Sequence, residues 1–195
     1  MKIVVLVKQV PDTWGERTLD STTGWVNRDG DNVIDEINER ALEVALSIKD
    51  ADKSAEVIAL TMAPDNVADS LKKALAMGCD SAIHVSDPAL AGADASVTAA
   101  VLSAAIRTVN PDLVIAGNES TDGRGGIVPS MIAEHLHIGH LGMLASIDVS
   151  SSSVSGIRLL EDGTQEVTCS LPAVISVSES NPDARFPSFK GIMGA

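Results

Sequence analysis

Residues 117–126 read GNESTDGRGG and hold the residue types best suited to binding a small ligand. They follow LVIA at 113–116, an apolar run typical of a buried strand. The glycines can expose backbone N–H groups, and a helix beginning after them would direct its positive N-terminal end at a ligand. Polar side chains at 119–122 can hydrogen-bond a ribose or an adenine edge, and Arg124 can neutralise an anion. The loop therefore favours a nucleotide phosphate, although a flexible surface loop has a similar composition.

Patterns for other chemistry are weak. The loop lacks the Lys-Ser/Thr pair of a Walker motif, no GxGxxG follows the first strand, and neither GxSxG nor CxxC spacing occurs. His135, His137 and His140 straddle a predicted helix end, so their spacing does not put all three on one helix face. Asp35 and Glu36 are interpreted as helix-start charges. We therefore expect no metal site and no catalytic residues, and a binding protein in place of an enzyme.

The elements that must position the loop can be predicted from hydrophobic periodicity. Four apolar runs predict strands, at residues 3–7, 56–61, 81–85 and 112–116. Apolar residues at helical spacing follow them, with predicted N-caps at Asp35 and Asp94, a glycine ending one helix at Gly78, and Pro129 where the last helix begins. This alternation predicts a mostly parallel, doubly wound α/β sheet with helices on both faces.

Ligands of such sheets bind beyond the carboxyl ends of the strands. KQVP at 8–11 follows the first predicted strand, TMAP at 61–64 follows the second, and the glycine loop follows the fourth. We expect these three segments to converge on one crevice.

The pattern changes after about residue 140. Short strands are predicted at residues 143–149, 157–160, 167–171 and 173–177, with a hairpin turn at Asp162-Gly163. They form an added small antiparallel element. Residues 17–34 are polar and rich in Gly and Asp, which predicts a hairpin or an excursion. One domain at 1–178 and an extended C-terminal tail at 179–195 are therefore expected.

Composition excludes several classes of partner. The net charge of −13 disfavours nucleic acid and anionic membranes. No apolar run reaches the roughly 20 residues of a membrane span, and no targeting segment is seen, so we expect a cytoplasmic protein without membrane insertion. Cys79 and Cys169 lie far apart and are expected to be reduced thiols.

The tail holds both phenylalanines of the chain, Phe186 and Phe189, within RFPSFK at 185–190. They either fold back onto the domain or anchor a partner. Aromatic and Arg side chains dominate binding hot spots, which favours the second interpretation.

Five blocks together are similar to one family: MKIVVLVKQVPD, VIDEINERALEVAL, KKALAMGCDSAIHV, AGNESTDGRGG and LPAVISV…RFPSFKGIM. In order along nearly the whole chain, they resemble the beta subunit of electron transfer flavoprotein. The resemblance implies a Rossmann-like, adenine-nucleotide-binding fold and a heterodimer with an alpha subunit that mainly holds a shared FAD. It also implies a buried, structural AMP in this chain. Such a complex carries electrons from dehydrogenases, acyl-CoA dehydrogenases among them, to a quinone oxidoreductase, as in fatty acid beta-oxidation.

The family's motifs place specific roles on this chain. The implied AMP site consists of Leu6, Asp35, Glu36, Ile37, Asn38, Met62, Gly117, Asn118, Glu119, Ser120, Thr121, Asp122, Gly123, Arg124, Gly125, Gly126, Ile127 and Val128. The implied partner-recognition residues are Arg185, Phe186, Phe189 and Lys190, with Phe189 as the apolar anchor.

The sequence departs from the family at three points. Members usually continue beyond GIM into a lysine-rich stretch and a C-terminal arm, whereas this sequence ends at Ala195. NPDAR at 181–185 replaces the more usual NEPR, and Arg124 stands where many members carry an acidic residue. The change at Arg124 bears on which nucleotide the subunit binds. The alternatives are AMP and a second FAD, which electron-bifurcating relatives carry in this subunit. Two other classes stay open: a standalone adenine-nucleotide-binding regulatory domain and an ATP-using adenylating enzyme, although no SGGxDS loop is present.

Overall fold

The computed structural model describes the backbone of residues 1–195 and every side chain except that of Lys190. Its centre is an eight-stranded sheet in the order β5-β4-β1-β6-β10-β7-β8-β9. The strands are β1 (Lys2–Leu6), β4 (Glu56–Met62), β5 (Ser81–Val85), β6 (Leu113–Gly117), β7 (Gly139–Val149), β8 (Ser153–Leu160), β9 (Gly163–Ser170) and β10 (Ala173–Val177). The pairs from β5 to β7 are parallel, and β7, β8 and β9 pair antiparallel.

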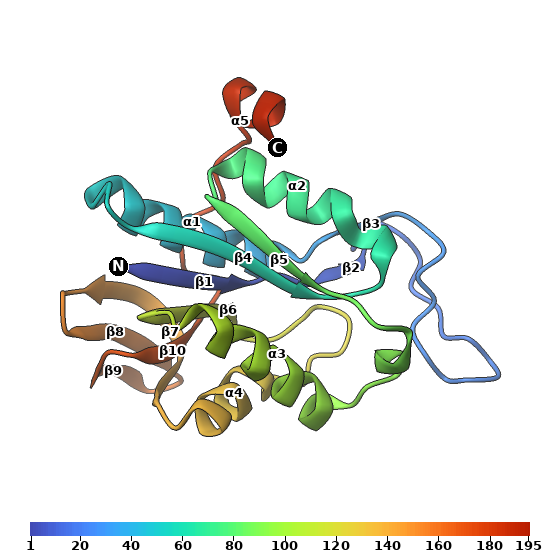
Figure 1. Cartoon of the computed structure of the whole chain (residues 1–195). Coiled ribbons are helices and arrows are strands. Elements are labelled where there is room, and N and C mark those ends of the chain that lie inside the picture. Colours follow the sequence, from blue (N-terminus) through green and yellow to red (C-terminus); the bar gives the residue numbers. More distant parts are fainter.

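Helices cover both faces of the parallel part (Figure 1). Helices α1 (Glu36–Ala51) and α2 (Ala68–Met77) pack on one face, and α3 (Ala95–Val109) and α4 (Val128–Leu136) on the other. Short 3₁₀ turns, η1 (Asp65–Val67) and η2 (Pro88–Leu90), precede α2 and α3. The doubly wound α/β architecture predicted from the alternating pattern is therefore confirmed.

The central strands are buried on both faces because almost all of their residues are apolar; Ser176 in β10 is a buried polar exception. All five residues of β6 and all five of β10 are buried. Alternate residues of each strand enter one of two cores: Ile3 and Ile115 pack under α1, whereas Val4 and Val114 pack under α3 and α4. A continuous aliphatic run is what a strand between two helical layers requires.

Local signals fixed several helix ends. The Asp94 side chain accepts a hydrogen bond from the Val97 N–H at 2.8 Å, as expected of an N-cap, and Gly78 ends α2 with a φ of 133°. Asp35 occupies the N-cap position of α1, but its side chain makes no cap hydrogen bond. The predicted capping role of Asp35 is therefore wrong, and its carboxylate points elsewhere.

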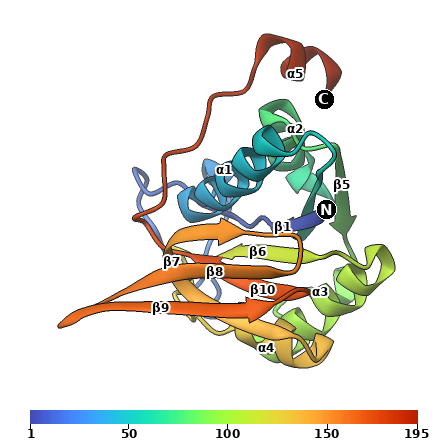
Figure 2. The same cartoon turned by 90° about the vertical axis from the view of Figure 1, so that its left-hand side faces the viewer.

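The second half is more regular than the sequence indicated. β7, β8 and β9 begin four residues earlier than their predicted starts at 143, 157 and 167, at Gly139, Ser153 and Gly163. β10 enters the main sheet between β6 and β7, so the antiparallel strands extend that sheet. Polar residues on the exposed face of these strands hid their true starts. Figure 2 shows the β8–β9 hairpin projecting from the body.

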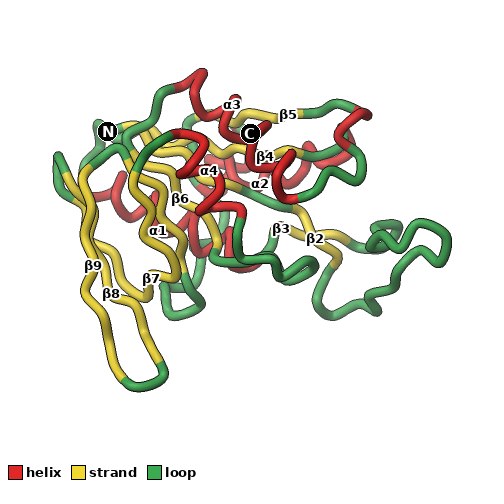
Figure 3. The backbone as a smooth tube through the Cα atoms, turned by 90° about the horizontal axis from the view of Figure 1, so that it is seen from below, coloured by secondary structure: helices red, strands yellow, loops and turns green.

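Residues 12–31 form an extended segment, here called the arm, at the carboxyl edge of the sheet (Figure 3). It connects β2 (Gln9–Pro11) to β3 (Asn32–Ile34), which pair antiparallel in a separate two-stranded sheet. One bridge, between Leu19 and Val26, closes its outer part. The predicted excursion is therefore present and has an ordered base.

The tail after β10 runs along α1 and ends in the short helix α5 (Phe189–Gly194), which packs on α2 (Figure 2). The sequence showed no periodicity there. Among the described residues, no helix has the length and apolar character needed to span a bilayer.

Candidate functional site

The carboxyl ends of three parallel strands lie side by side. β1 pairs with β4 and with β6, and Leu6 at the end of β1 is opposite Leu60. The Val7 N–H continues this register by donating to the carbonyl oxygen of Leu60 at 2.8 Å. The turns after β1 and β6 and the first residues of α1 therefore meet at one edge of the sheet.

Lys8, directly after β1, connects these segments. Its backbone N–H donates to Asn38 Oδ1 at 2.8 Å, which holds the start of α1. Its ammonium reaches the loop after β6, donating to Asp122 Oδ1 at 2.6 Å and to Ser120 Oγ at 3.2 Å. One residue thus fixes the relative positions of β1, α1 and the glycine loop.

Asp122 is the electrostatic centre of the loop. Its side chain is only 2% exposed and pairs with both Lys8 and Arg28, the second contact measuring 2.5 Å. Burial alone would raise the pKa of this carboxyl, but hydrogen bonds from Lys8 and Arg28 outweigh it and hold the pKa far below its ordinary value. Asp122 is therefore ionised at neutral pH and acts as a fixed anchor.

Asp35 is the most unusual group of the site. It is fully buried, and its Oδ2 accepts a hydrogen bond from the Thr121 N–H at 2.7 Å. Its Oδ1 is buried without a hydrogen-bond partner. Burial raises the pKa of this carboxyl despite the Thr121 hydrogen bonds. A buried oxygen without a partner is costly, so Oδ1 is an unsatisfied acceptor in this structure.

Gly117 permits a close approach of α1 to the sheet. A Cβ there would lie 2.6 Å from Ile37 Cγ2 and 2.7 Å from Asn38 Nδ2. Only glycine lets the first turn of α1 rest on the end of β6, beside Asp35. The requirement at this glycine is space, since its φ lies outside the left-handed range.

The far end of the loop has exposed backbone donors. Arg124 and Gly126 adopt left-handed φ values of 47° and 64°. The hydrogen bonds of the described residues include none donated by the backbone N–H groups of Gly125, Gly126 or Ile127. These groups lead into the N-terminus of α4, where the helix dipole favours an anion.

A cleft of about 330 Å³ lies between α1, the glycine loop and the segment that follows β10. Six predicted site residues line it: Glu36, Ile37, Glu119, Ser120, Thr121 and Arg124. Arg17, Arg40 and Glu179 complete the lining. Arg124 donates to Glu119 Oε1 from Nε and Nη2, at 3.1 and 3.0 Å.

Other predicted site residues lie on the opposite side of the sheet. Leu6, Met62 and Val128 pack with the core under α3 and α4. The structure thus places the predicted residues at one edge but divides them between two faces, with Gly117 and Asp35 at the boundary. Asn118 bonds back to the sheet, because its N–H donates to the Val177 carbonyl at 3.0 Å.

Sequence reasoning missed the cations that hold the loop. Lys8 was noted only as part of a turn, and Arg17 and Arg28 lie in the arm, which was predicted only as an excursion. One sequence signal could have found them. The polar insertion between the first strand and the first helix carries arginines, although the chain as a whole is acidic.

The tail presents a second candidate surface. Phe186 is 94% exposed and Phe189 is 82% exposed, so neither phenylalanine folds back onto the domain. Ile192 and Met193 in α5 are also exposed. These four side chains are here called the α5 patch.

Arg185 is not free to contact a partner in this structure. Its guanidinium donates to both oxygens of Glu43 at 2.8 Å and pairs with Asp50 at 2.8 Å. Arg40 likewise binds the tail through the Asn181 carbonyl and Asp183. Arg185 thus holds the tail on α1, and the side chain of Lys190 lies outside the described residues.

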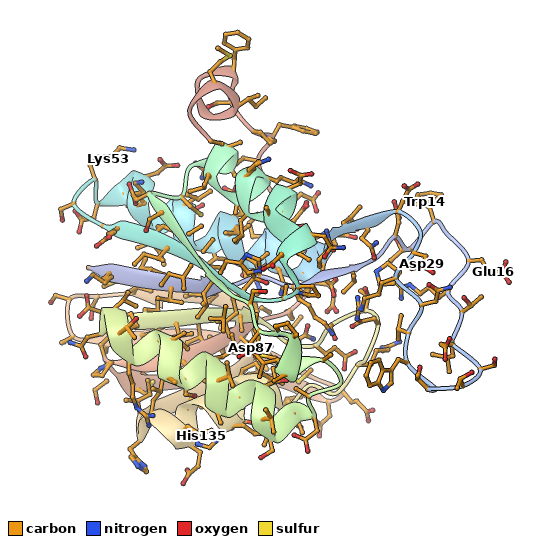
Figure 4. All side chains as sticks on the ribbon, turned by 45° about the vertical axis from the view of Figure 1, so that its right-hand side comes forward. Trp14, Glu16, Asp29, Lys53, Asp87 and His135 are labelled. Carbon is orange, nitrogen blue, oxygen red and sulfur yellow. The ribbon has the colours of Figure 1, made fainter. Side chains whose placement is uncertain are left out.

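The histidines are dispersed. His84 Nε2 is 2.8 Å from the Ala63 carbonyl, and His140 is partly buried, which lowers its pKa. His135 lies at the end of α4 (Figure 4). A search of the described residues found no group of three His, Cys, Asp or Glu residues arranged to hold a metal ion.

These features define a doubly wound α/β protein with a cleft of about 330 Å³ beside the glycine loop. The profile of the electron transfer flavoprotein domain matches residues 23–195. A Mycobacterium leprae protein named electron transfer flavoprotein subunit beta is 45% identical over 99% of this chain and 75% of its own length. Subunit CarD of the caffeyl-CoA reductase-Etf complex of Acetobacterium woodii is 38% identical over the whole chain and 75% of its length. An electron transfer flavoprotein subunit beta of Syntrophomonas wolfei is 33% identical, again over the whole chain and 76% of its length. The chain belongs to the electron transfer flavoprotein family.

Proposed function

We propose that this chain is an electron transfer flavoprotein beta subunit that binds AMP without reacting with it. It pairs with an alpha subunit that mainly holds FAD, and the complex carries electrons from dehydrogenases to a quinone oxidoreductase. The names of the relatives, which match along almost the whole chain, support the carrier role. The single observation that carries the AMP assignment is the buried, unpartnered Oδ1 of Asp35.

The crevice suits each part of AMP. Leu6 and Met62 offer apolar contact for an adenine face, and Asp35 Oδ1 offers an acceptor for an amino or hydroxyl donor. The free N–H groups of Gly125 to Ile127 and the start of α4 offer donors to a phosphate.

FAD supplies the redox chemistry when it is bound in the heterodimer. This chain would contribute position and environment. Residues of the 330 Å³ cleft carry both charge signs and face the loop, so they are candidates for the side turned toward the alpha subunit. Whether this subunit takes AMP or a second FAD depends on the room around Arg124.

The α5 patch is proposed as the docking anchor for dehydrogenases. Phe189, Ile192 and Met193 are exposed on α5, and Phe186 is exposed just before it; exposed apolar patches mark interaction sites. Electron transfer needs brief encounters, so a small apolar contact with fast release suits the role. Arg185 and Arg40 would act by holding α5 in place.

Coexpression with the alpha subunit tests the proposal. We expect a yellow heterodimer that releases AMP on denaturation and accepts electrons from a dehydrogenase. The chain expressed alone should be colourless and still release AMP. A homodimer that binds exchangeable ATP and ignores the alpha subunit would instead support the regulatory alternative.

A further inference from the structure

The arm leaves the carboxyl edge of the sheet beside the glycine loop, and its Arg17 lines the 330 Å³ cleft. Its base is the β2–β3 pair, directly after β1, and it extends past the ends of the strands (Figure 3). Three contacts attach it to two segments: two contacts reach the loop after β6, and the third reaches the connection after β5. These contacts involve Arg17, Arg28 and Trp25, and each comes from a different part of the arm.

Arg17 attaches the arm to the glycine loop on the α1 side. Its Nη1 donates to the Thr121 carbonyl at 2.6 Å, and Nη2 donates to Thr121 Oγ1 at 3.1 Å and to the Pro11 carbonyl at 3.0 Å. Thr121 is the residue whose N–H binds Asp35. Arg17 also lines the 330 Å³ cleft.

Arg28 makes a second, independent attachment. Its Nη2 donates to Asp122 Oδ2 at 2.5 Å, and its Nη1 donates to the Gln9 carbonyl at 3.2 Å. A planar guanidinium with several donors can join two segments in this way, whereas lysine offers a single ammonium. Both arginines therefore connect the arm, the turn after β1 and the loop after β6.

Trp25 makes the third contact of the arm. Its indole ring lies against Gly92, in the connection between η2 and α3: a Cβ at Gly92 would be 2.4 Å from Trp25 Cζ2. Trp25 as a whole is still 53% exposed. The arm thus touches both the loop after β6 and the segment after β5.

We propose that the arm is a retaining strap for the nucleotide, with Arg17, Arg28 and Trp25 as its positioning residues. This inference rests on the proposed AMP site. With the strap attached, AMP cannot leave the crevice without breaking contacts to Thr121, Asp122 or Gly92. The strap explains how a ligand that takes no part in the reaction stays bound through many electron-transfer cycles.

Exchange of bound AMP for isotope-labelled AMP tests the strap in the purified heterodimer. Wild-type protein should exchange slowly, and Arg17→Ala and Arg28→Ala should each exchange about tenfold faster or more, since each loses charge-assisted or bidentate hydrogen bonds. Trp25→Ala should also accelerate exchange, because it removes the contact with Gly92. Arg17→Lys should fall between wild type and Arg17→Ala.

Glu16→Gln is the matched control. Glu16 neighbours Arg17 but lies on the outer side of the arm (Figure 4), and removing its charge should leave exchange unchanged. A thermal unfolding midpoint measured for each variant separates strap opening from global destabilisation. If a variant fails to fold, a measurement on the wild type takes its place. Deuterium uptake at residues 12–31 is compared with and without added AMP, and the strap requires that uptake fall when AMP binds.

The outcomes are distinct. If the wild type contains AMP but all three variants exchange it at the wild-type rate, the strap is overturned and the proposed function stands. Faster exchange in Arg17→Ala and Trp25→Ala with normal unfolding midpoints would establish it. Absence of AMP from the wild type would overturn both.

Discussion

Asp35 accepts a hydrogen bond at 2.7 Å from the backbone N–H of Thr121, 86 positions further along the chain. The contact joins the start of α1 to the glycine loop across the end of the sheet. It uses one carboxylate oxygen of a fully buried residue and leaves the other without a partner. The proposed ligand site is organised around that free oxygen.

Asp35→Asn should separate ligand binding from stability. The amide oxygen can still accept from Thr121, and the cost of burying a charge disappears, so the free energy of unfolding at neutral pH should not fall. AMP affinity should fall about tenfold or more, because a charge-assisted hydrogen bond is lost. Nucleotide released per chain and a denaturant titration measure the two effects. Retention of full AMP content would contradict the assigned role.

Gly117→Ala should disturb the contact between α1 and β6. The new Cβ would overlap Ile37 and Asn38 at 2.6 and 2.7 Å, which we expect to cost about 1–3 kcal/mol of stability. Gly125→Ala is the control, since nothing lies within 4 Å of its Cβ. Denaturant midpoints of the two variants should differ clearly, and equal midpoints would argue against the close approach.

Acid should weaken the loop through Asp122. Because its folded pKa is depressed, Asp122 contributes stability above the ordinary value of 3.8, and this contribution is lost as pH falls below that value. Asp122→Asn should lower stability by about 1–2 kcal/mol at neutral pH, since its two cationic partners remain partly exposed. The difference between variant and wild type should shrink in acid. A difference that stays constant with pH would exclude the ion pairs as its cause.

Glu43→Gln should loosen the tail. Burial alone would raise the pKa of Glu43, but the hydrogen bonds from Arg185 outweigh it and lower the pKa. We expect the variant to lose about 1 kcal/mol and to accept electrons from a dehydrogenase more slowly. Glu134→Gln is the control, because Glu134 is exposed on α4 and makes no ion pair with the other described residues. The two variants are compared with the wild type by stopped-flow measurement of the flavin reduction rate at matched flavin content.

Phe189→Ala tests the α5 patch directly. The side chain is 82% exposed, so its removal should leave stability and flavin content unchanged. Electron acceptance at low dehydrogenase concentration should slow about tenfold, as expected for losing one buried aromatic anchor. Val97→Ala, an exposed apolar change on α3, should have no effect. Equal rates for wild type and Phe189→Ala would remove the anchor assignment.

Much of the fold could be predicted because its signals are local. The aliphatic runs that became β1, β4 and β6, the N-cap Asp94 and the glycine at 78 each act within a few residues. The polar strands β8 and β9 were harder, since β8 has one buried residue and β9 has none, and their periodicity is weak. The helix α5 could not be predicted, because it rests on α2 through Gly191, where a Cβ would lie 2.1 Å from the Ala76 carbonyl oxygen.

The candidate site was predicted less completely than the fold. Sequence order and glycine content located the loop, and the family resemblance supplied the residue set. The long-range pairs could not be found from spacing: Lys8 to Asp122 spans 114 positions, and Arg185 to Glu43 spans 142. Asp35 illustrates the limit, since a local capping rule explained its position but a distant loop uses its side chain.

The most direct measurement is the mass of the small molecule released when the purified, unreacted heterodimer is denatured. The account predicts AMP in a one-to-one ratio with this chain, in addition to the FAD of the complex. Recovery of no adenine nucleotide beyond that FAD, or of a second FAD in place of AMP, would contradict it.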